Sequence, residues 1–174
     1  MAGSFQDERF AEAATQFGGA IGRLARAYEA DVDVRRDLVQ DIHLALWRSL
    51  ATFDDRCSMR TWVYRVAHNV AASHALRRSK GRRERLATLG DLADLASNDD
   101  PEGQVAERQA LGRLMGLIHQ LETTDRQVML LYLEDLDAAG IGEVTGLSAG
   151  AVATKIHRLK ALLARRFNLG GLNG

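Results

Sequence analysis

Cysteine and proline are nearly absent from this sequence, since each occurs once among 174 residues. Because Cys57 has no partner within the chain, no intramolecular disulfide can form, which favours a protein that works in a reducing cytoplasm. No apolar run approaches the roughly 18 residues of a membrane-spanning helix, and the N-terminal stretch MAGSFQDERF is too polar for a secretory signal. We therefore expect a cytoplasmic protein with no membrane insertion.

The patterns that mark enzymes are also missing. No histidine stands with Cys57 or with carboxylates at the spacing of metal ligands. No glycine-rich phosphate loop follows a strand, and no serine occupies a nucleophile elbow. The five scattered histidines are His43, His68, His74, His119 and His157. The sequence therefore predicts no catalytic residue, no metal and no cofactor, and the protein is not expected to be an enzyme.

Net charge of one sign is a third absence, because 23 Lys and Arg residues balance 23 Asp and Glu residues. The charges are nevertheless segregated along the chain. Residues 56–85 are strongly basic with one acid, Glu84, residues 86–107 are acidic with no Lys or Arg, and the chain is basic again after Val144. Whether nucleic acid is a partner therefore depends on where these charges lie in the fold.

Apolar residues recur at helical spacing through most of the chain, and no segment alternates with a period of two. This pattern predicts an all-α protein with two small helical domains. We place the first domain at 1–80, with helices over 10–28, 34–50 and 58–80, and the second at 102–174. The acidic stretch 81–101 is weakly periodic, ends on the single proline, Pro101, and is expected to be a flexible linker.

Local signals predict further details of both domains. In the third helix the expected buried stripe consists of Trp62, Val66, Val70 and Ala71. In the second domain, Thr124 and Gln127 have the spacing of a capping box, which predicts a helix start near residue 124.

The stretch DAAGIGEVTGLSAGAVATKIHRLKALL has the layout of a helix-turn-helix. Asp137 and Ser148 are each placed to cap a helix, and Gly146 supplies the turn. At about 100 degrees per residue, the second helix separates its apolar and polar side chains. The apolar set is Val152, Ile156, Leu159 and Leu163; the opposite face carries Gly150, Thr154, His157, Arg158 and Arg165, with Lys155 and Lys160 beside it. Gly140 and Gly142 weaken the first helix by about 1 kcal/mol each relative to alanine, which only close packing or close backbone approach would explain.

The basic face of the second helix predicts a DNA partner. Small residues at its start permit close approach, the positive end of its dipole faces phosphates, and the longer side chains can reach base edges in the major groove. The candidate DNA-binding residues are Ser148, Gly150, Thr154, Lys155, His157 and Arg158. A surface helix with a solvated basic face is the alternative that this segment alone leaves open.

Two longer stretches carry a family resemblance. DLVQDIHLALWRSLATFDDRCSMRTWVYRVAHNVAASHALRRSK resembles region 2 of bacterial sigma factors, and LETTDRQVMLLYLEDLDAAGIGEVTGLSAGAVATKIHRLKALLARRF resembles their region 4. The pair, joined by a short acidic linker, is similar to the extracytoplasmic-function (ECF) group of the sigma-70 family. The resemblance implies a sigma factor that binds core RNA polymerase and directs transcription initiation from promoter DNA.

The resemblance also implies roles for residues of the first domain. The helix around Asp41 would dock on the clamp of the large polymerase subunit through an apolar ridge with an acid beside it. The loop and helix that follow would recognise and open the −10 promoter element, which requires a pocket for an unstacked base and cations along the displaced strand. The docking residues are Leu38, Gln40, Asp41, Leu44 and Trp47; the melting residues are Phe53, Arg60, Arg65, Asn69, Arg77 and Arg78. The helix-turn-helix would read the −35 element.

Several alternatives stay open. Leu38, Leu44 and Trp47 could be core residues only, and Trp62 is expected to pack inside because it lies nearly opposite Tyr64 on a helix. The acidic linker could be a solvated spacer or a mimic of a phosphate backbone. Ala153, Lys155 and Ser73 depart from frequent residues of the family, which leaves the promoter sequence undetermined. A stand-alone helix-turn-helix regulator and a polymerase-binding adaptor are the alternative functions, and an anti-sigma factor is an open partner.

Overall fold

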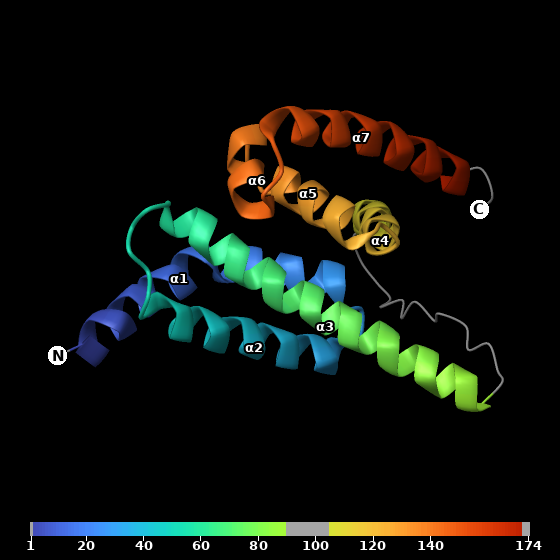
Figure 1. Ribbon diagram of the computed structural model, residues 1–174. Coiled ribbons are helices and arrows are strands. Elements are labelled where there is room, and N and C mark those ends of the chain that lie inside the picture. Colours follow the sequence, from blue (N-terminus) through green and yellow to red (C-terminus); the bar gives the residue numbers. More distant parts are fainter. Residues whose placement is uncertain (1, 90–104, 172–174) are drawn as a thin grey trace.

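The computed structural model describes residues 2–89 and 105–171, and seven helices form two lobes in this part of the chain (Figure 1). Lobe one contains α1 (Ala2–Tyr28), α2 (Val32–Leu50) and α3 (Met59–Leu89). Lobe two contains α4 (Val105–His119), α5 (Thr123–Leu133), α6 (Ala138–Thr145) and α7 (Ala149–Gly171). The described residues form no strand, which confirms the all-α prediction, and none of their helices is long and apolar enough to cross a membrane.

The three helices of lobe one pack against one another around a shared core. The Asp31 carboxylate caps α2 by accepting hydrogen bonds from the amides of Asp33 and Val34, at 3.0 and 3.1 Å. The buried residues of α2 are Leu38, Ile42, Leu46 and Leu50, and this spacing of four puts them on one side of the helix. The opposite side of α2 is therefore free to carry other chemistry.

The buried face of α3 differs from the predicted stripe. Ala71 is buried as predicted, but Trp62, Val66 and Val70 are only partly buried. The residues of α3 that are buried are Thr61, Val63, Tyr64, Ala67, His68 and Ala71. The buried side of α3 differs from the predicted one because α3 contacts α6 of lobe two as well as α1 and α2. The spacing of apolar residues within α3 gives no sign of that contact.

Helix α3 does not end at residue 80 as predicted but continues to Leu89. The residues after Gly81, RRERLATL, are mostly good helix formers, and one glycine costs only about 1 kcal/mol within a helix. The first part of the predicted linker 81–101 is therefore helical. The acidic residues at 91, 94, 99, 100 and 102 lie outside the described residues.

The helix-turn-helix is confirmed by its caps and its turn. The Asp137 carboxylate accepts a hydrogen bond from the Gly140 amide at 2.8 Å, and the Ser148 hydroxyl accepts one from the Ala151 amide at 3.2 Å. Gly146 ends α6 with a φ of 79 degrees, in the left-handed region that favours glycine. The two helices close on Ile141, Val144 and Val152, all of them buried.

The predicted capping box at the start of α5 is wrong, although the helix starts within one residue of the predicted position. Glu122 is the N-cap residue and its side chain makes no capping hydrogen bond. The connection from α4 is instead fixed by the Arg126 guanidinium, which donates to the carbonyls of His119 and Leu121 at 2.5 and 3.0 Å. An arginine one turn into the new helix thus satisfies carbonyls that the end of α4 leaves open.

Gly142 is required by a close backbone approach inside the helix-turn-helix. A Cβ atom at this position would lie 2.6 Å from the Leu147 carbonyl oxygen, whereas one at Gly140 would lie 3.1 Å from a carboxylate oxygen of the Asp137 side chain. A side chain can move aside, but the backbone of the turn cannot do so without moving α7.

We expect Gly142→Ala to lower the free energy of unfolding by about 1–3 kcal/mol, because overpacking against the backbone exceeds the gain in helix propensity. Gly112→Ala is the control, with the same gain in propensity at a helix position where a Cβ would meet nothing within 4 Å, and it should not destabilise the protein. Urea unfolding followed by circular dichroism measures both. A Gly142→Ala protein as stable as the wild type would show that the turn is not tightly packed.

Candidate polymerase and promoter surfaces

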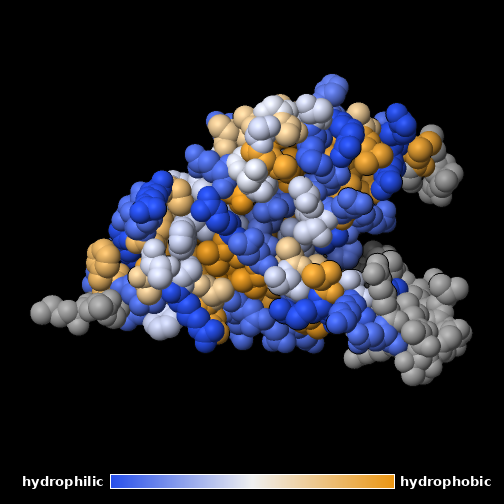
Figure 2. Space-filling model, in the orientation of Figure 1, coloured by the Kyte–Doolittle hydropathy of each residue, from blue (hydrophilic) through white to orange (hydrophobic). Residues whose placement is uncertain are grey.

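The exposed side of α2 carries four of the five predicted docking residues, which we call the docking face: Gln40, Asp41, Leu44 and Trp47. Leu44 and Trp47 are 46% and 38% exposed, which is high for large apolar side chains. On the side of the molecule seen in Figure 2, hydrophilic residues predominate and apolar patches interrupt them on both lobes. The interpretation of Leu44 and Trp47 as core residues is therefore wrong.

Leu38 is a correction to the predicted docking set. Its side chain is 0% exposed and belongs to the core of lobe one, on the buried side of α2 with Ile42 and Leu46. The reason is angular: Leu38 leads the buried row of spacing four, whereas Gln40, Leu44 and Trp47 form the outer row. Leu38 can support the docking face only from inside.

The loop between α2 and α3, residues 51–58, holds Phe53 against other side chains. The Phe53 ring centroid lies 5.1 Å from that of Trp62, and the Arg9 guanidinium lies 5.2 Å from the Phe53 centroid. The Trp62 indole donates to the Ser49 hydroxyl at 3.0 Å, but Trp62 is only half-buried and lines a pocket, so it does not pack fully inside as expected. Phe53 is therefore a packed residue of the loop and not a free stacking surface.

A pocket of about 470 Å³ lies beside this loop. Its walls come from the loop, from α3 and from α6 of lobe two, and they are lined by Asp54, Arg56, Cys57, Trp62, Arg65 and Glu143. Aromatic and cationic side chains thus surround a space next to the predicted melting residues. The contribution of Glu143 was missed by sequence reasoning, because a residue of the helix-turn-helix gives no signal of contact with the first domain.

Lobe two lies directly over two of the predicted melting residues. The Arg65 guanidinium donates to the Glu143 carbonyl at 2.6 Å, and the Arg60 guanidinium donates to the Glu134 carbonyl. The Thr61 hydroxyl adds a hydrogen bond to the Glu143 carboxylate at 3.2 Å. Figure 1 shows the corresponding arrangement, with α6 above the start of α3. The guanidinium groups of Arg60 and Arg65 are therefore bound to lobe two in this closed arrangement, although Arg60 stays exposed.

Glu134, at the end of α5, is the centre of the contact between the lobes. Its carboxylate accepts two hydrogen bonds from the Arg23 guanidinium, at 2.5 and 2.8 Å, and one from the Tyr64 hydroxyl at 3.2 Å. The hydrogen bond and charge of Arg23 lower the pKa of Glu134 below its ordinary value. The part of the contact that depends on this charge is thus present at neutral pH and weakens as the pH falls and the carboxylate is protonated. Neither Arg23 nor Glu134 was a sequence candidate.

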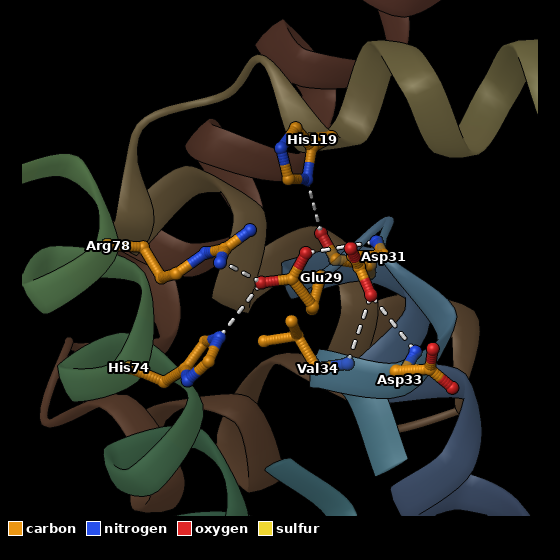
Figure 3. A network of polar contacts seen from close by, with 8 residues as sticks. Glu29, Asp31, Asp33, Val34, His74, Arg78 and His119 are labelled. Atoms are coloured by element: carbon orange, nitrogen blue, oxygen red, sulfur yellow. Dashed lines mark hydrogen bonds and ion pairs between the residues drawn. The ribbon is translucent and has the colours of Figure 1, made fainter. Parts of the chain in front are cut away.

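The remaining predicted melting residues lie further along α3. Asn69, Arg77 and Arg78 are exposed. Arg78 also has a partner within the protein, because its Nε lies 3.2 Å from the buried carboxylate of Glu29. Figure 3 shows that the Glu29 carboxylate also meets His74, at 3.0 Å, and the Asp31 amide. Glu29 therefore fixes the orientation of Arg78.

A buried pair links α1 to the middle of α3. The Tyr28 hydroxyl and the His68 Nδ1 are 3.2 Å apart, and the Arg126 guanidinium of lobe two lies 5.0 Å from the Tyr28 ring centroid. Burial lowers the pKa of His68 to about 3 and raises the pKa of Tyr28 to about 12. His68 is therefore a neutral packing residue at physiological pH.

Because His68 is neutral in the folded chain, we expect the free energy of unfolding to fall with pH at values well above those at which carboxylates titrate. The unfolded chain binds a proton at His68 below about pH 6.5, whereas the folded chain does not, so stability falls as the pH drops. Between pH 7 and pH 5 the loss should be about 2 kcal/mol. We expect His68→Leu to remove this part of the slope when urea unfolding is compared at the two pH values. An unchanged slope would contradict a buried neutral His68.

The predicted DNA-binding residues of the helix-turn-helix lie on the outer face of α7 and at its N-terminus. Ser148, Gly150, Thr154, His157 and Arg158 are exposed, and Lys155 is half-buried. One carboxylate holds two of the cations: Asp125 of α5 lies 2.5 Å from the Lys155 Nζ and 3.0 Å from an Arg158 Nη. Asp125 was missed because its distance of 30 residues from Lys155 matches no helical period.

The described residues contain no group of three or more His, Cys, Asp or Glu side chains that could hold a metal ion. Together the fold and these surfaces define a two-domain helical protein whose second domain is a helix-turn-helix of the DNA-binding kind.

Comparison with known proteins identifies the family. The Sigma-70 region 2 model matches residues 14–82, and the Sigma-70, region 4 model matches residues 111–163. RNA polymerase sigma factor CnrH of Cupriavidus metallidurans is 33% identical over 173 residues, which cover 94% of this chain and 89% of that protein. ECF RNA polymerase sigma factor SigC of Mycobacterium tuberculosis is 31% identical over 146 residues, which cover 79% and 73%.

Two solved structures share the fold. The structure of CnrH in complex with the cytosolic domain of CnrY has a TM-score of 0.67 and 24% identity, and covers 97% of this chain and 93% of that chain. The sigma factor RpoE in complex with the anti-sigma factor NepR, from Bartonella quintana, has a TM-score of 0.68 and 16% identity, and covers 90% and 94%.

The chain belongs to the sigma-70 family of RNA polymerase sigma factors, in its ECF group. It is a sigma factor that acts with core RNA polymerase in promoter-directed transcription initiation. The region 2 match also accounts for lobe one. The alternative hypothesis, a stand-alone helix-turn-helix regulator, gives no role to this lobe.

Proposed function

We propose that the docking face of α2 binds core RNA polymerase. The observation that carries this assignment is the exposure of Leu44 and Trp47 in one row with Gln40, next to the exposed Asp41. Large apolar side chains at the centre of a surface, with a charge beside them, form the usual composition of a binding hot spot. Asp41 would pair with a basic group of the polymerase and guide its approach.

Promoter opening falls to the loop 51–58 and the N-terminal half of α3. The pocket beside the loop has a volume of about 470 Å³ and an aromatic wall at Trp62, which suits an unstacked base. Arg60, Arg65 and Asn69 are spaced along one stretch of α3, where two cations and an amide can follow a displaced strand. Arg77 and Arg78 extend this basic path.

Recognition of the −35 element falls to α7. Thr154, His157 and Arg158 are exposed on the second helix of the motif, the geometry in which such a helix enters the major groove. Ser148 and Gly150 at its start leave room for the phosphate backbone, and Asp125 holds Lys155 and Arg158 in place.

The closed lobes belong to the free chain, and they must part before lobe one can hold DNA. This follows from the contacts of Arg60 and Arg65, whose donors are directed to carbonyls of lobe two. The solved relatives in complex with CnrY and with the anti-sigma factor NepR make an anti-sigma factor a candidate partner of this chain. The chain would act in the cytoplasm, where the polymerase is, and without catalysis of its own.

Run-off transcription tests this function. Purified core RNA polymerase is incubated with genomic DNA fragments from the source organism, with and without the protein. We expect new discrete transcripts that share a pair of upstream elements. Binding to core without new transcripts would favour an adaptor, and failure to bind core would contradict the docking assignment.

A further inference from the structure

The first turns of α1 extend past the rest of lobe one and reach the loop 51–58. The sequence predicted a helix from residue 10, but α1 already includes the residues before it. In this extension the Arg9 guanidinium forms an ion pair with the Asp55 carboxylate at 2.8 Å. It also lies 5.2 Å from the ring centroid of Phe53 and 4.7 Å from that of Phe5. One side chain thus holds two residues of the loop.

The same extension holds the end of α2. The Gln6 amide donates to the Trp47 carbonyl at 2.6 Å, and the Trp47 indole donates to the Asp7 carboxylate at 2.8 Å. Because Gln6 and Asp7 make these contacts, α1 is anchored next to the loop independently of Arg9. Arg9 therefore projects from a part of α1 that other residues hold in place. Its guanidinium contacts Asp55, Phe53 and Phe5.

The loop needs such a support. Asp55 has a φ of 60 degrees, in the left-handed region that costs a non-glycine residue roughly 1 kcal/mol. Within the loop, Asp54 is occupied by Arg56, through an ion pair at 2.8 Å. Asp55 is instead paired with a residue from outside the loop, Arg9. Without Arg9, Asp55 would lose this ion pair and Phe53 would lose its contact with the guanidinium.

We propose that Arg9 is a positioning residue for promoter opening, which holds the loop 51–58 in place through Asp55 and Phe53. The proposal rests on the assignment of promoter opening to this loop. Arg9 does not line the pocket, and the contacts of α1 with Trp47 of the docking face come from Gln6 and Asp7, so the effect of Arg9 should fall on opening and not on polymerase binding. The full chain with core polymerase, on a promoter identified by run-off transcription, is the system in which to test it.

Arg9→Ala is expected to slow open-complex formation on duplex promoter DNA by about 3- to 10-fold, with unchanged affinity for core polymerase. A template with a pre-melted bubble at the −10 element should restore near wild-type behaviour, because the step that Arg9 supports is already done. Asp55→Ala breaks the same pair from the loop side, so the double variant Arg9→Ala, Asp55→Ala should be no slower than Arg9→Ala. Permanganate reactivity of unpaired thymines measures opening.

Arg113→Ala is the matched control. Arg113 lies 4.4 Å from the Phe167 ring centroid and donates to the Phe167 carbonyl at 2.9 Å, so it has a similar arginine–aromatic contact far from the loop. Its loss should leave opening unchanged. Normal opening by Arg9→Ala, additive effects in the double variant, or no rescue by the bubble would each overturn the proposal.

Phe53→Ala separates this proposal from the assignment on which it rests. If Phe53→Ala slows opening and Arg9→Ala does not, the loop acts in opening and only the role of Arg9 fails. If neither variant slows opening, the assignment of the loop itself fails together with the role of Arg9.

Discussion

Replacing Glu134 with arginine is expected to separate the two lobes of the free chain. The change reverses the charge at the point where Arg23, Tyr64 and Arg60 converge, so two arginines of lobe one would repel the new side chain. Helix α5 itself should tolerate the substitution, because Glu134 is its C-cap residue and a cation is favourable at that end of the helix dipole. The disruption therefore falls on the contact between the lobes.

The expected effect is large because the Glu134 side chain is mostly covered, with an exposed fraction of 18%. Breaking a partly buried, hydrogen-bonded ion pair shifts the closed equilibrium by about 10- to 100-fold, which corresponds to about 1.4–2.8 kcal/mol. Small-angle scattering should show a larger radius of gyration, and binding of free protein to single-stranded −10 DNA should strengthen as the guanidinium groups of Arg60 and Arg65 are released from the carbonyls of lobe two.

The charge-swapped double variant Arg23→Glu, Glu134→Arg serves as the control, since it restores an ion pair in the reverse direction. It should recover part of the closed population. A Glu134→Arg protein that stays as compact as the wild type would show that the other contacts, between α1 and α4 and between α3 and α6, keep the lobes together without this carboxylate.

The second large effect is expected at the outer face of α7. The double variant Thr154→Ala, Arg158→Ala should lose discrimination at the −35 element by about 10- to 100-fold, because a good base contact contributes about 1–3 kcal/mol. Thr154 already uses its hydroxyl hydrogen on the Gly150 carbonyl, at 3.0 Å, which leaves its methyl group for contact with a base. Arg158 keeps most of its guanidinium exposed beside Asp125.

Transcription from a promoter library randomised at the −35 element measures this effect, with dependence on the −10 element as the internal reference. Arg165→Ala is the matched control, because Arg165 is exposed on the same helix but lies beyond the half that would enter the groove. Retained −35 preference in the double variant would contradict the assignment of these residues to base recognition.

The helices of this chain could largely be predicted because their signals are local. Asp137, Gly146 and Ser148 are caps and turn residues whose effect extends over a few neighbours, and all three act as the sequence indicates. The expected capping box at Thr124 is absent because α5 begins one residue earlier, at Thr123, with Glu122 as its N-cap residue. The local pattern thus locates the start of the helix but does not decide which residue caps it.

The surfaces were harder to predict because they depend on contacts between segments far apart in the sequence. Leu38 and Leu44 differ only in the side of α2 on which they lie, and the family pattern does not separate a residue of the core from a residue of the surface. The partners of Arg23 and Arg65 are 111 and 78 residues away, with no periodicity to announce them. Only the packing of lobe two on lobe one brings them together.

The pocket beside the loop has a practical consequence through its single thiol. Cys57 is the chain's one cysteine, it is half-buried, and the wall it belongs to is shared with Glu143 of the other lobe. A small thiol-reactive dye would therefore attach at one native position, without any engineered substitution. The emission of the dye would depend on the polarity of the pocket, which changes when lobe two moves away. Cys57 is therefore a native labelling site for following the separation of the two lobes.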